Sequence, residues 1–220
     1  MPRTSTSVSL RLRREAWGFA IGSVFFAVGA VPAYADAVGP VWDAATFAAG
    51  SVFFTLAGFI QLALSGRRPP RGDSTPGEVA DWWSAAIQFA GTLLFNVSTF
   101  AVLFGARSGT GELSTGWVPD AWGSVCFLVA SGLALVAASR RHELWDRHAR
   151  TWRGTWLNMA GSVAFGAAAV GAYVLPLTGE FVNVRWVNLG TFLGALCFFT
   201  AALLSRRGIP RPEAGARSAE

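Results

Sequence analysis

The sequence predicts an all-α membrane protein with six transmembrane helices, arranged as three pseudo-repeated helical hairpins with both termini in the cytoplasm. Three observations carry this prediction: six long apolar stretches, a short motif that recurs in them, and an uneven distribution of arginine. Hydrophobic residues make up 52% of the chain and charged residues only 14%. Soluble proteins carry roughly 25% charged residues, so this composition favours a chain embedded in lipid.

Six apolar segments are long enough to cross a bilayer as helices, which takes about 20 residues. Helices are the expected form, because lipid offers no partners to free backbone groups and the segments lack the alternation of barrel strands. Most of the ten tryptophans lie near the segment ends, as in the aromatic belts of membrane proteins. The segments are Ala16–Ala35, Val41–Leu64, Trp82–Gly105, Val118–Ala138, Thr155–Leu177 and Val184–Leu204.

One membrane domain is expected over residues 16–204, with a basic cytoplasmic tail at 1–15 and a disordered cytoplasmic tail at 205–220. The first 35 residues also resemble a cleavable signal peptide that ends in Ala33-Tyr34-Ala35. We expect this segment to be retained, because its apolar run is long for a signal and shares a motif with the next segment.

Arginine sets the orientation, and all eighteen basic residues are arginine. Sixteen fall in the two tails and in the second and fourth connecting loops, whereas the third and fifth loops have only Arg107 and Arg185. Positive loops stay in the cytoplasm, so we expect a multi-pass protein of the cell membrane. The arginines would contact anionic lipid headgroups, which explains the basic pI without nucleic acid. A homo-oligomer or a second membrane protein is left open as a partner.

A glycine–hydroxyl–phenylalanine motif marks the helices. "GSVFF" occurs at residues 22–26 and 50–54, and looser copies follow as "GTLLF", "GSVCF" and "GSVAF". The sixth segment has a degenerate copy, either at Gly190-Thr191 or as "GALCF" from Gly194. Gly22 and Gly91 are 69 residues apart, and Gly91 and Gly161 are 70 apart. This spacing divides the chain into parallel hairpin repeats at about 16–65, 82–138 and 155–204.

The motif predicts close helix packing. Small residues let helix backbones approach one another in lipid, and a phenylalanine four residues later lies on the same face. The hydroxyl groups can bond the carbonyl of the preceding turn, so they need no ligand. The glycines assigned to packing are Gly22, Gly50, Gly91, Gly123, Gly161 and Gly194.

One stretch supports a family resemblance. The pattern "WDAATFAAGSVFFTLAGFIQL", which is clearest over residues 42–61, resembles the short two-helix YrhK-like membrane proteins. The whole chain resembles longer bacterial integral membrane proteins built from such hairpins. The resemblance implies an origin by fusion of hairpins, and it carries over no activity and no catalytic residue.

Four amides within the spans are candidates for a polar path. Polar groups inside a membrane are costly, so each is a functional hypothesis. Gln88 and Asn158 lie three residues before their motif glycines, Asn96 lies near the middle of its span, and Asn188 lies near an outer helix end. The alternative is hydrogen bonding between helices, worth on the order of 1 kcal/mol each.

Two carboxylates open helices at the expected outer face. Asp43 and Asp120 lie in first turns, where the helix dipole stabilises negative charge and capping is the ordinary explanation. The functional alternative is an acidic outer mouth that attracts cations.

No pattern of an enzyme, a metal site or a cofactor site is evident. The absence of lysine excludes Schiff-base chemistry, and no span contains a histidine. His142 and His148 share the fourth loop without a zinc-binding spacing. Cys126 and Cys197 lie in apolar runs as small hydrophobes.

Two functions fit these patterns. One is a small passive pore or transporter for a small solute or ion, with the amides on its wall. The other is a non-catalytic membrane component whose small-residue faces pack against a partner. The sequence names neither a substrate nor a reaction.

Overall fold

The computed structural model describes residues 5–66, 68–109, 116–146 and 152–207. This part of the chain forms seven helices and no strand, so the prediction of an all-α fold is confirmed. The helices are α1 (Ser5–Gly29), α2 (Pro32–Val38), α3 (Pro40–Ser65), α4 (Pro76–Ser108), α5 (Trp117–Arg140), α6 (Trp152–Gly171) and α7 (Val184–Arg207).

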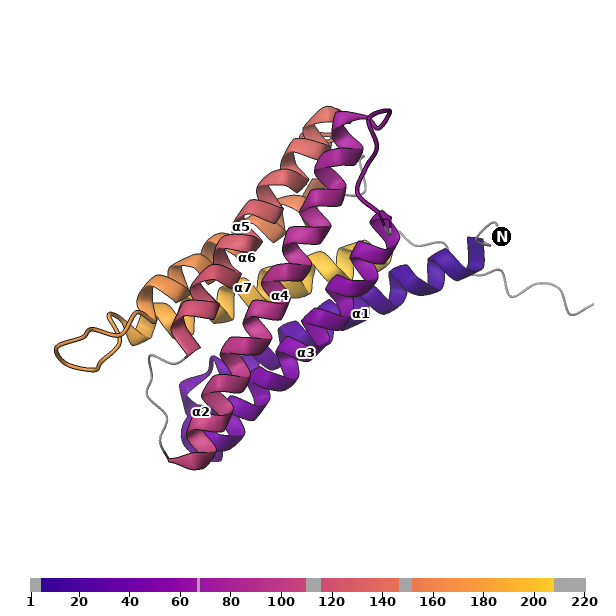
Figure 1. Cartoon of the computed structure of the whole chain (residues 1–220). Helices are drawn as coiled ribbons and strands as arrows, with labels where there is room; N and C mark the ends of the chain where they lie inside the picture. Colours follow the sequence, from indigo (N-terminus) through magenta and orange to yellow (C-terminus); the bar gives the residue numbers. More distant parts are fainter. Residues whose placement is uncertain (1–4, 67, 110–115, 147–151, 208–220) are drawn as a thin grey trace, which may run out of the picture.

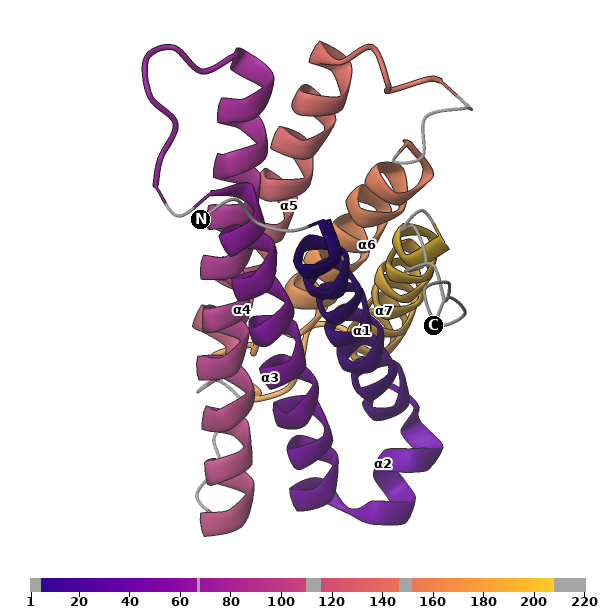
Figure 2. The same cartoon turned by 90° about the vertical axis from the view of Figure 1, so that its right-hand side faces the viewer.

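The six long helices form a closed bundle (Figure 1, Figure 2). Each long helix packs against the next one along the chain, and α7 packs against α1 to complete the ring. The short helix α2 packs on the first turns of α3, at the lower end of the bundle in Figure 2.

Several of these helices are suited to a membrane. Helices α3, α4, α5 and α7 are long and apolar enough to cross it, and the broken pair α1–α2 is a fifth candidate. Helix α6, with 20 residues, is not among these candidates, because no stretch of it that is long enough to span a membrane is equally apolar. The apolar helices indicate a membrane-embedded protein.

The first expected span, Ala16–Ala35, is not one continuous helix. Helix α1 ends at Gly29, and α2 begins at Pro32 at an angle of 79°. Proline has no N–H for the helical bond and its ring clashes with the preceding turn, which explains the break. At the other end, α1 begins at Ser5, so most of the expected tail at 1–15 is helical.

Two other boundaries differ from the prediction by six residues each. Helix α6 ends at Gly171 instead of reaching Leu177, because the chain turns back near Pro176 and pairs Val174 with Phe181. Helix α4 begins at Pro76 instead of Trp82, because Thr75 and Glu78 form a capping box. Residues 208–220, which cover most of the expected C-terminal tail, lie outside the described residues, as do His148 and its neighbours at 147–151.

The motif glycines interlock with the motif phenylalanines of the neighbouring helix. A Cβ atom added to Gly22 would lie 2.5 Å from Phe54 Cδ2, and one added to Gly50 would lie 2.8 Å from Phe26 Cδ2. The contact is thus reciprocal between α1 and α3. The same reciprocal contact joins α4 to α5 and α6 to α7, through Gly91 and Phe127, Gly123 and Phe95, Gly161 and Phe198, and Gly194 and Phe165.

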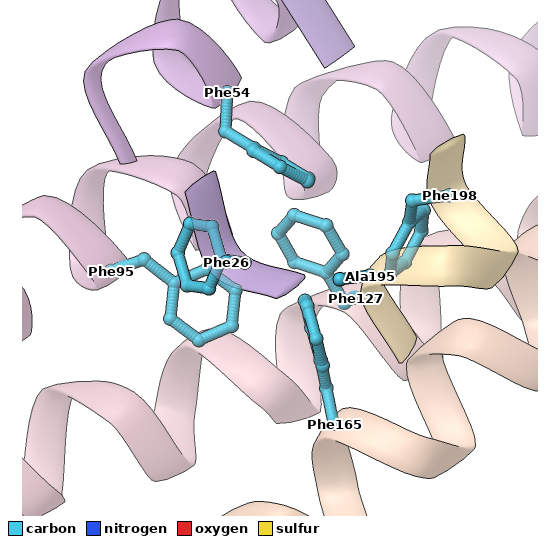
Figure 3. Close-up of a cluster of buried hydrophobic side chains, with 7 residues drawn as sticks. All are labelled: Phe26, Phe54, Phe95, Phe127, Phe165, Ala195 and Phe198. Carbon is cyan, nitrogen blue, oxygen red and sulfur yellow. The ribbon is translucent and has the colours of Figure 1, made fainter. Parts of the chain in front are cut away.

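The six motif phenylalanines meet on the axis of the bundle, where they form a phenylalanine plug with Ala195 (Figure 3). Ring centroids within the plug lie 5.1 to 6.5 Å apart, the separation that aromatic pairs favour. All six rings are buried. They come from all six long helices, so the plug holds the ring of helices together at one level.

The motif hydroxyls are also buried. Four of the five donate to a carbonyl of the preceding turn in their own helix; these are Ser23, Ser51, Thr92 and Ser162. The fifth, Ser124, donates to the carbonyl of Phe165 on α6. The hydroxyl groups are therefore satisfied without a ligand.

We expect Gly22→Ala to destabilise the protein, because its Cβ would meet Phe54 and the carbonyl oxygen of Gly50, 2.9 Å away. Overpacking of this kind costs about 1–3 kcal/mol. The matched control is Gly132→Ala on α5, where a Cβ meets nothing within 4 Å and alanine favours the helix. Thermal unfolding in detergent should show a lower midpoint for Gly22→Ala only. Equal midpoints for the two variants would contradict the interlock.

Candidate functional site

A cavity of about 560 Å³ lies inside one end of the bundle. This is the end at which α3, α5 and α7 begin, and we call it the cavity end. All seven helices contribute to the lining, together with Phe181 from the segment between α6 and α7. The volume falls in the range of pockets that hold small molecules.

The lining positions recur at fixed distances from the motif glycines. Seven residues before the motif glycine, the N-terminal ends of α3, α5 and α7 place Asp43, Gly116 and Val187 in the cavity wall; Gly116 is the residue just before the first residue of α5. Three residues before the glycine they place Phe47, Asp120 and Thr191 there. Equivalent backbone positions of the three helices therefore line the cavity. Their side chains differ in type, so polar and apolar groups are unevenly distributed over the wall.

The phenylalanine plug forms the floor of the cavity. Phe26, Phe95 and Phe165 belong both to the plug and to the lining. At the rim, Pro32 and Pro40 are exposed, so the cavity reaches the surface at this end. Solute that entered from the rim would therefore stop at the three rings.

Both predicted carboxylates line the cavity. Asp43 and Asp120 are each the fourth residue of their helix, yet neither caps that helix with a side-chain hydrogen bond. Asp43 Oδ1 is buried and has no hydrogen-bond partner among the described residues. The helix dipole still explains why a carboxylate is found in each first turn. The unpartnered Asp43 Oδ1 can accept a hydrogen bond from a bound molecule.

The four amides of the predicted polar path lie in different surroundings. Asn188 lines the cavity. Gln88 is buried in α4 and Asn158 is half-buried in α6, and neither lines this cavity or bonds the other. A role for Gln88 and Asn158 in a path stays a prediction.

Asn96 is occupied by hydrogen bonds between α3 and α4. Its Nδ2 donates to Thr55 Oγ1 at 2.6 Å, and its Oδ1 lies 2.6 Å from Ser51 Oγ, whose single hydrogen is shared with the carbonyl of Ala48. Ser51 Oγ also lies 2.9 Å from Thr99 Oγ1. These contacts correspond to the interhelical alternative, and they use one N–H group and one oxygen lone pair of the Asn96 amide.

Trp117 is held in the cavity wall by two contacts. Its Nε1 donates to the carbonyl of Ala169 at 2.9 Å, and its ring packs edge-on against Tyr173 with centroids 4.9 Å apart. The first turn of α5 is therefore fixed to the end of α6, which also positions Asp120. The sequence predicts that Trp117 lies near a membrane surface. The structure shows that it also forms part of the cavity wall.

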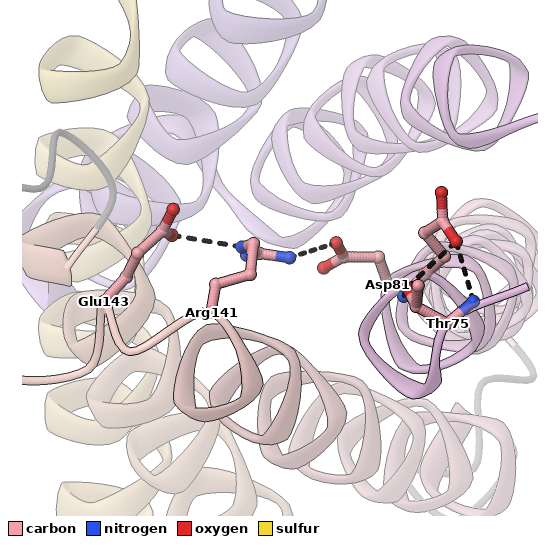
Figure 4. A network of polar contacts seen from close by, with 5 residues as sticks. Thr75, Asp81, Arg141 and Glu143 are labelled. Carbon is pink, nitrogen blue, oxygen red and sulfur yellow. Dashed lines mark hydrogen bonds and ion pairs between the residues drawn. The ribbon is translucent and has the colours of Figure 1, made fainter.

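The opposite end of the bundle, at the top in Figure 2, carries an ionic link between α4 and the segment after α5 (Figure 4). Arg141 pairs with Asp81 of α4, and its Nε donates to Glu143 at 3.2 Å. Burial lowers the pKa of Arg141, but the bonds to Glu143 and Asp81 outweigh that effect and raise it above the usual value. Because the pair is partly exposed, its contribution to stability is small.

The described residues contain no group of three histidine, cysteine, aspartate or glutamate side chains that could hold a metal ion. The cavity lining supplies apolar surface, aromatic rings, hydroxyl groups and two carboxyl groups, all of which can contact a bound small molecule.

The lining residues recur at fixed offsets from the motif glycines, but these offsets alone do not indicate a cavity. Phe47 and Thr191 stand at the same place relative to the motif as Asp120, but their types share no property that would mark a site. Phe181 carries no signal in sequence, because only the turn after α6 brings it to the cavity.

Comparison of the chain with protein-family models, with curated proteins and with solved structures finds no match.

Proposed function

We propose that all six long helices cross the cell membrane as three pseudo-repeated hairpins, with both termini in the cytoplasm. The main support is the residue two places after each motif glycine, which is apolar and 39% to 55% exposed in every long helix, including α6. These residues are Val24, Val52, Leu93, Val125, Val163 and Leu196. A belt of exposed apolar side chains around a bundle is suited to lipid.

Charge supports the orientation. Arg68, Arg71, Arg140 and Arg141 lie around the end at which α3 and α5 finish and α4 begins. At the cavity end, α4 and α7 carry Arg107 and Arg185. With the arginine-rich end in the cytoplasm, the cavity faces the outside.

We further propose that the protein is a small transporter whose outer cavity receives a small solute. One observation carries this proposal: the cavity leads from an exposed rim to the phenylalanine plug on the bundle axis. The plug fills the axis, so an always-open pore does not fit, and passage requires the rings to move apart. Binding sites between helices near the membrane centre are typical of transporters built from repeats.

Orientation and access are tested by labelling introduced cysteines with a charged thiol reagent that does not cross membranes. In a background with Cys126→Ala and Cys197→Ala, we expect Asn188→Cys and Thr191→Cys to be labelled from outside intact cells. Both residues line the cavity. The control Ser84→Cys lies buried against α5, where Ser84 donates to the carbonyl of Ala130, and should stay unlabelled.

Labelling of Thr191→Cys only after the cytoplasmic face is opened would reverse the orientation. Complete protection of both cavity positions from either face would contradict an accessible cavity, and it would favour a packing or partner-binding role instead.

The path is tested by removing rings from the plug. We expect Phe95→Ala/Phe165→Ala to raise the glycerol permeability of proteoliposomes by at least about tenfold, which corresponds to a barrier lowered by roughly 1.4 kcal/mol. Stopped-flow light scattering measures the rate. The control is Phe59→Ala, which removes a ring that is 59% exposed on α3.

The single variant Phe95→Ala guards against a double variant that does not fold, and size-exclusion chromatography checks each sample. Properly folded variants that are as impermeable as the wild type would exclude the bundle axis as the route.

A further inference from the structure

Among the described residues, the cavity lining has acidic side chains and no basic ones. Asp43 and Asp120 are the ionisable side chains in its lining, and no arginine or histidine of the described chain is among the lining residues. Arg107 and Arg185 lie on helices at this end but are exposed and outside the lining. A bound anion would therefore meet two carboxylates without a compensating positive group.

One carboxylate oxygen lacks a partner inside the protein. Asp43 Oδ1 is buried and receives no hydrogen bond from the described residues. An unpaired buried acceptor is costly, and a bound ammonium group would supply both the missing donor and the opposite charge. Asp120 lines the same cavity from α5, so a second carboxyl group can interact with a bound cation.

The rest of the lining is suited to an apolar body. Phe47, Trp117 and Phe181 contribute aromatic side chains to the wall, and the plug contributes three more rings to the floor. Aromatic rings attract cations through their faces and bury apolar groups. A hydrated metal ion uses none of this surface, whereas an organic cation uses both the carboxylates and the rings.

We propose that the cavity binds small amphipathic organic cations, meaning amines with an apolar or aromatic body. This inference rests on the proposed function, since it names the class of solute that the outer cavity receives. The ammonium group bonds the unpartnered oxygen of Asp43, Asp120 lines the same cavity closer to the plug, and the apolar body lies against the rings at the floor.

The test uses three probes of one shape and different charge: phenylbutylamine, phenylbutanol and phenylbutyrate. Binding to the protein in nanodiscs is measured with radiolabelled probe, and empty nanodiscs supply the background. We expect the amine to bind at least about tenfold more tightly than the alcohol, and the acid to bind more weakly still.

Asp43→Asn and Asp120→Asn should each reduce the preference for the amine, and Asp43→Glu and Asp120→Glu should retain it. The matched control is Asp36→Asn, which removes the same charge from α2 at the same end but outside the lining. It should leave the preference unchanged. The glutamate variants distinguish loss of the carboxyl group from misfolding. They keep a carboxyl group at each position, so they retain the preference for the amine only if that group is its cause.

Equal binding of amine and alcohol that is insensitive to both asparagine variants would overturn the cation preference and leave the outer cavity intact. Failure of all three probes to bind, while Thr191→Cys is labelled from outside, would also overturn it. Failure of that labelling would instead overturn the proposed function.

Discussion

The structure depends on a glycine of one helix facing a phenylalanine of its neighbour. Helices in lipid gain little hydrophobic free energy by associating. The attraction therefore comes from van der Waals contacts between closely approaching backbones. Gly22 and Gly50 let α1 and α3 approach until the backbone of one meets the ring of the other, and the same contact joins the other two helix pairs. The rings that fill these holes then meet on the axis, so a contact between two helices also places the centre of the whole bundle.

Two of the three contacts between the pairs also include hydrogen bonds between side chains. Between α3 and α4, Asn96 bonds Ser51 and Thr55, and between α5 and α6, Ser131 Oγ lies 2.8 Å from Ser162 Oγ. Hydrogen bonds demand a defined geometry, so they set how the pairs face one another, while the interlock sets how closely helices approach. The cavity lies beyond the level of the plug, where no phenylalanine of the motif reaches the axis and α2 bends away from the line of α1.

The motif and the helical fold were predictable from the sequence, because the spacing of residues along a helix determines which side chains share a face. The break before Pro32 and the capping box at Thr75 and Glu78 have sequence signals too, but the apolar run and the tryptophans obscured them. The plug and the cavity were not predictable, since a recurring phenylalanine indicates a packed face and not that six faces converge. Asp43 shows the same limit: its place in a first turn suggests a cap, and only the structure shows an unpaired oxygen in a cavity wall.

The most direct test of the interlock is a double-mutant cycle between Gly91 and Phe127. A Cβ atom on Gly91 would lie 2.9 Å from Phe127 Cδ2, and leucine at position 127 would free that space. Gly91→Ala and Phe127→Leu should each lower the free energy of unfolding, and together they should cost less than their sum, by about 0.5–3 kcal/mol. Pairing Gly91→Ala with Phe25→Leu, whose ring stacks on Phe53 outside the plug, should give additive losses. Additive losses for Gly91→Ala with Phe127→Leu would contradict the account.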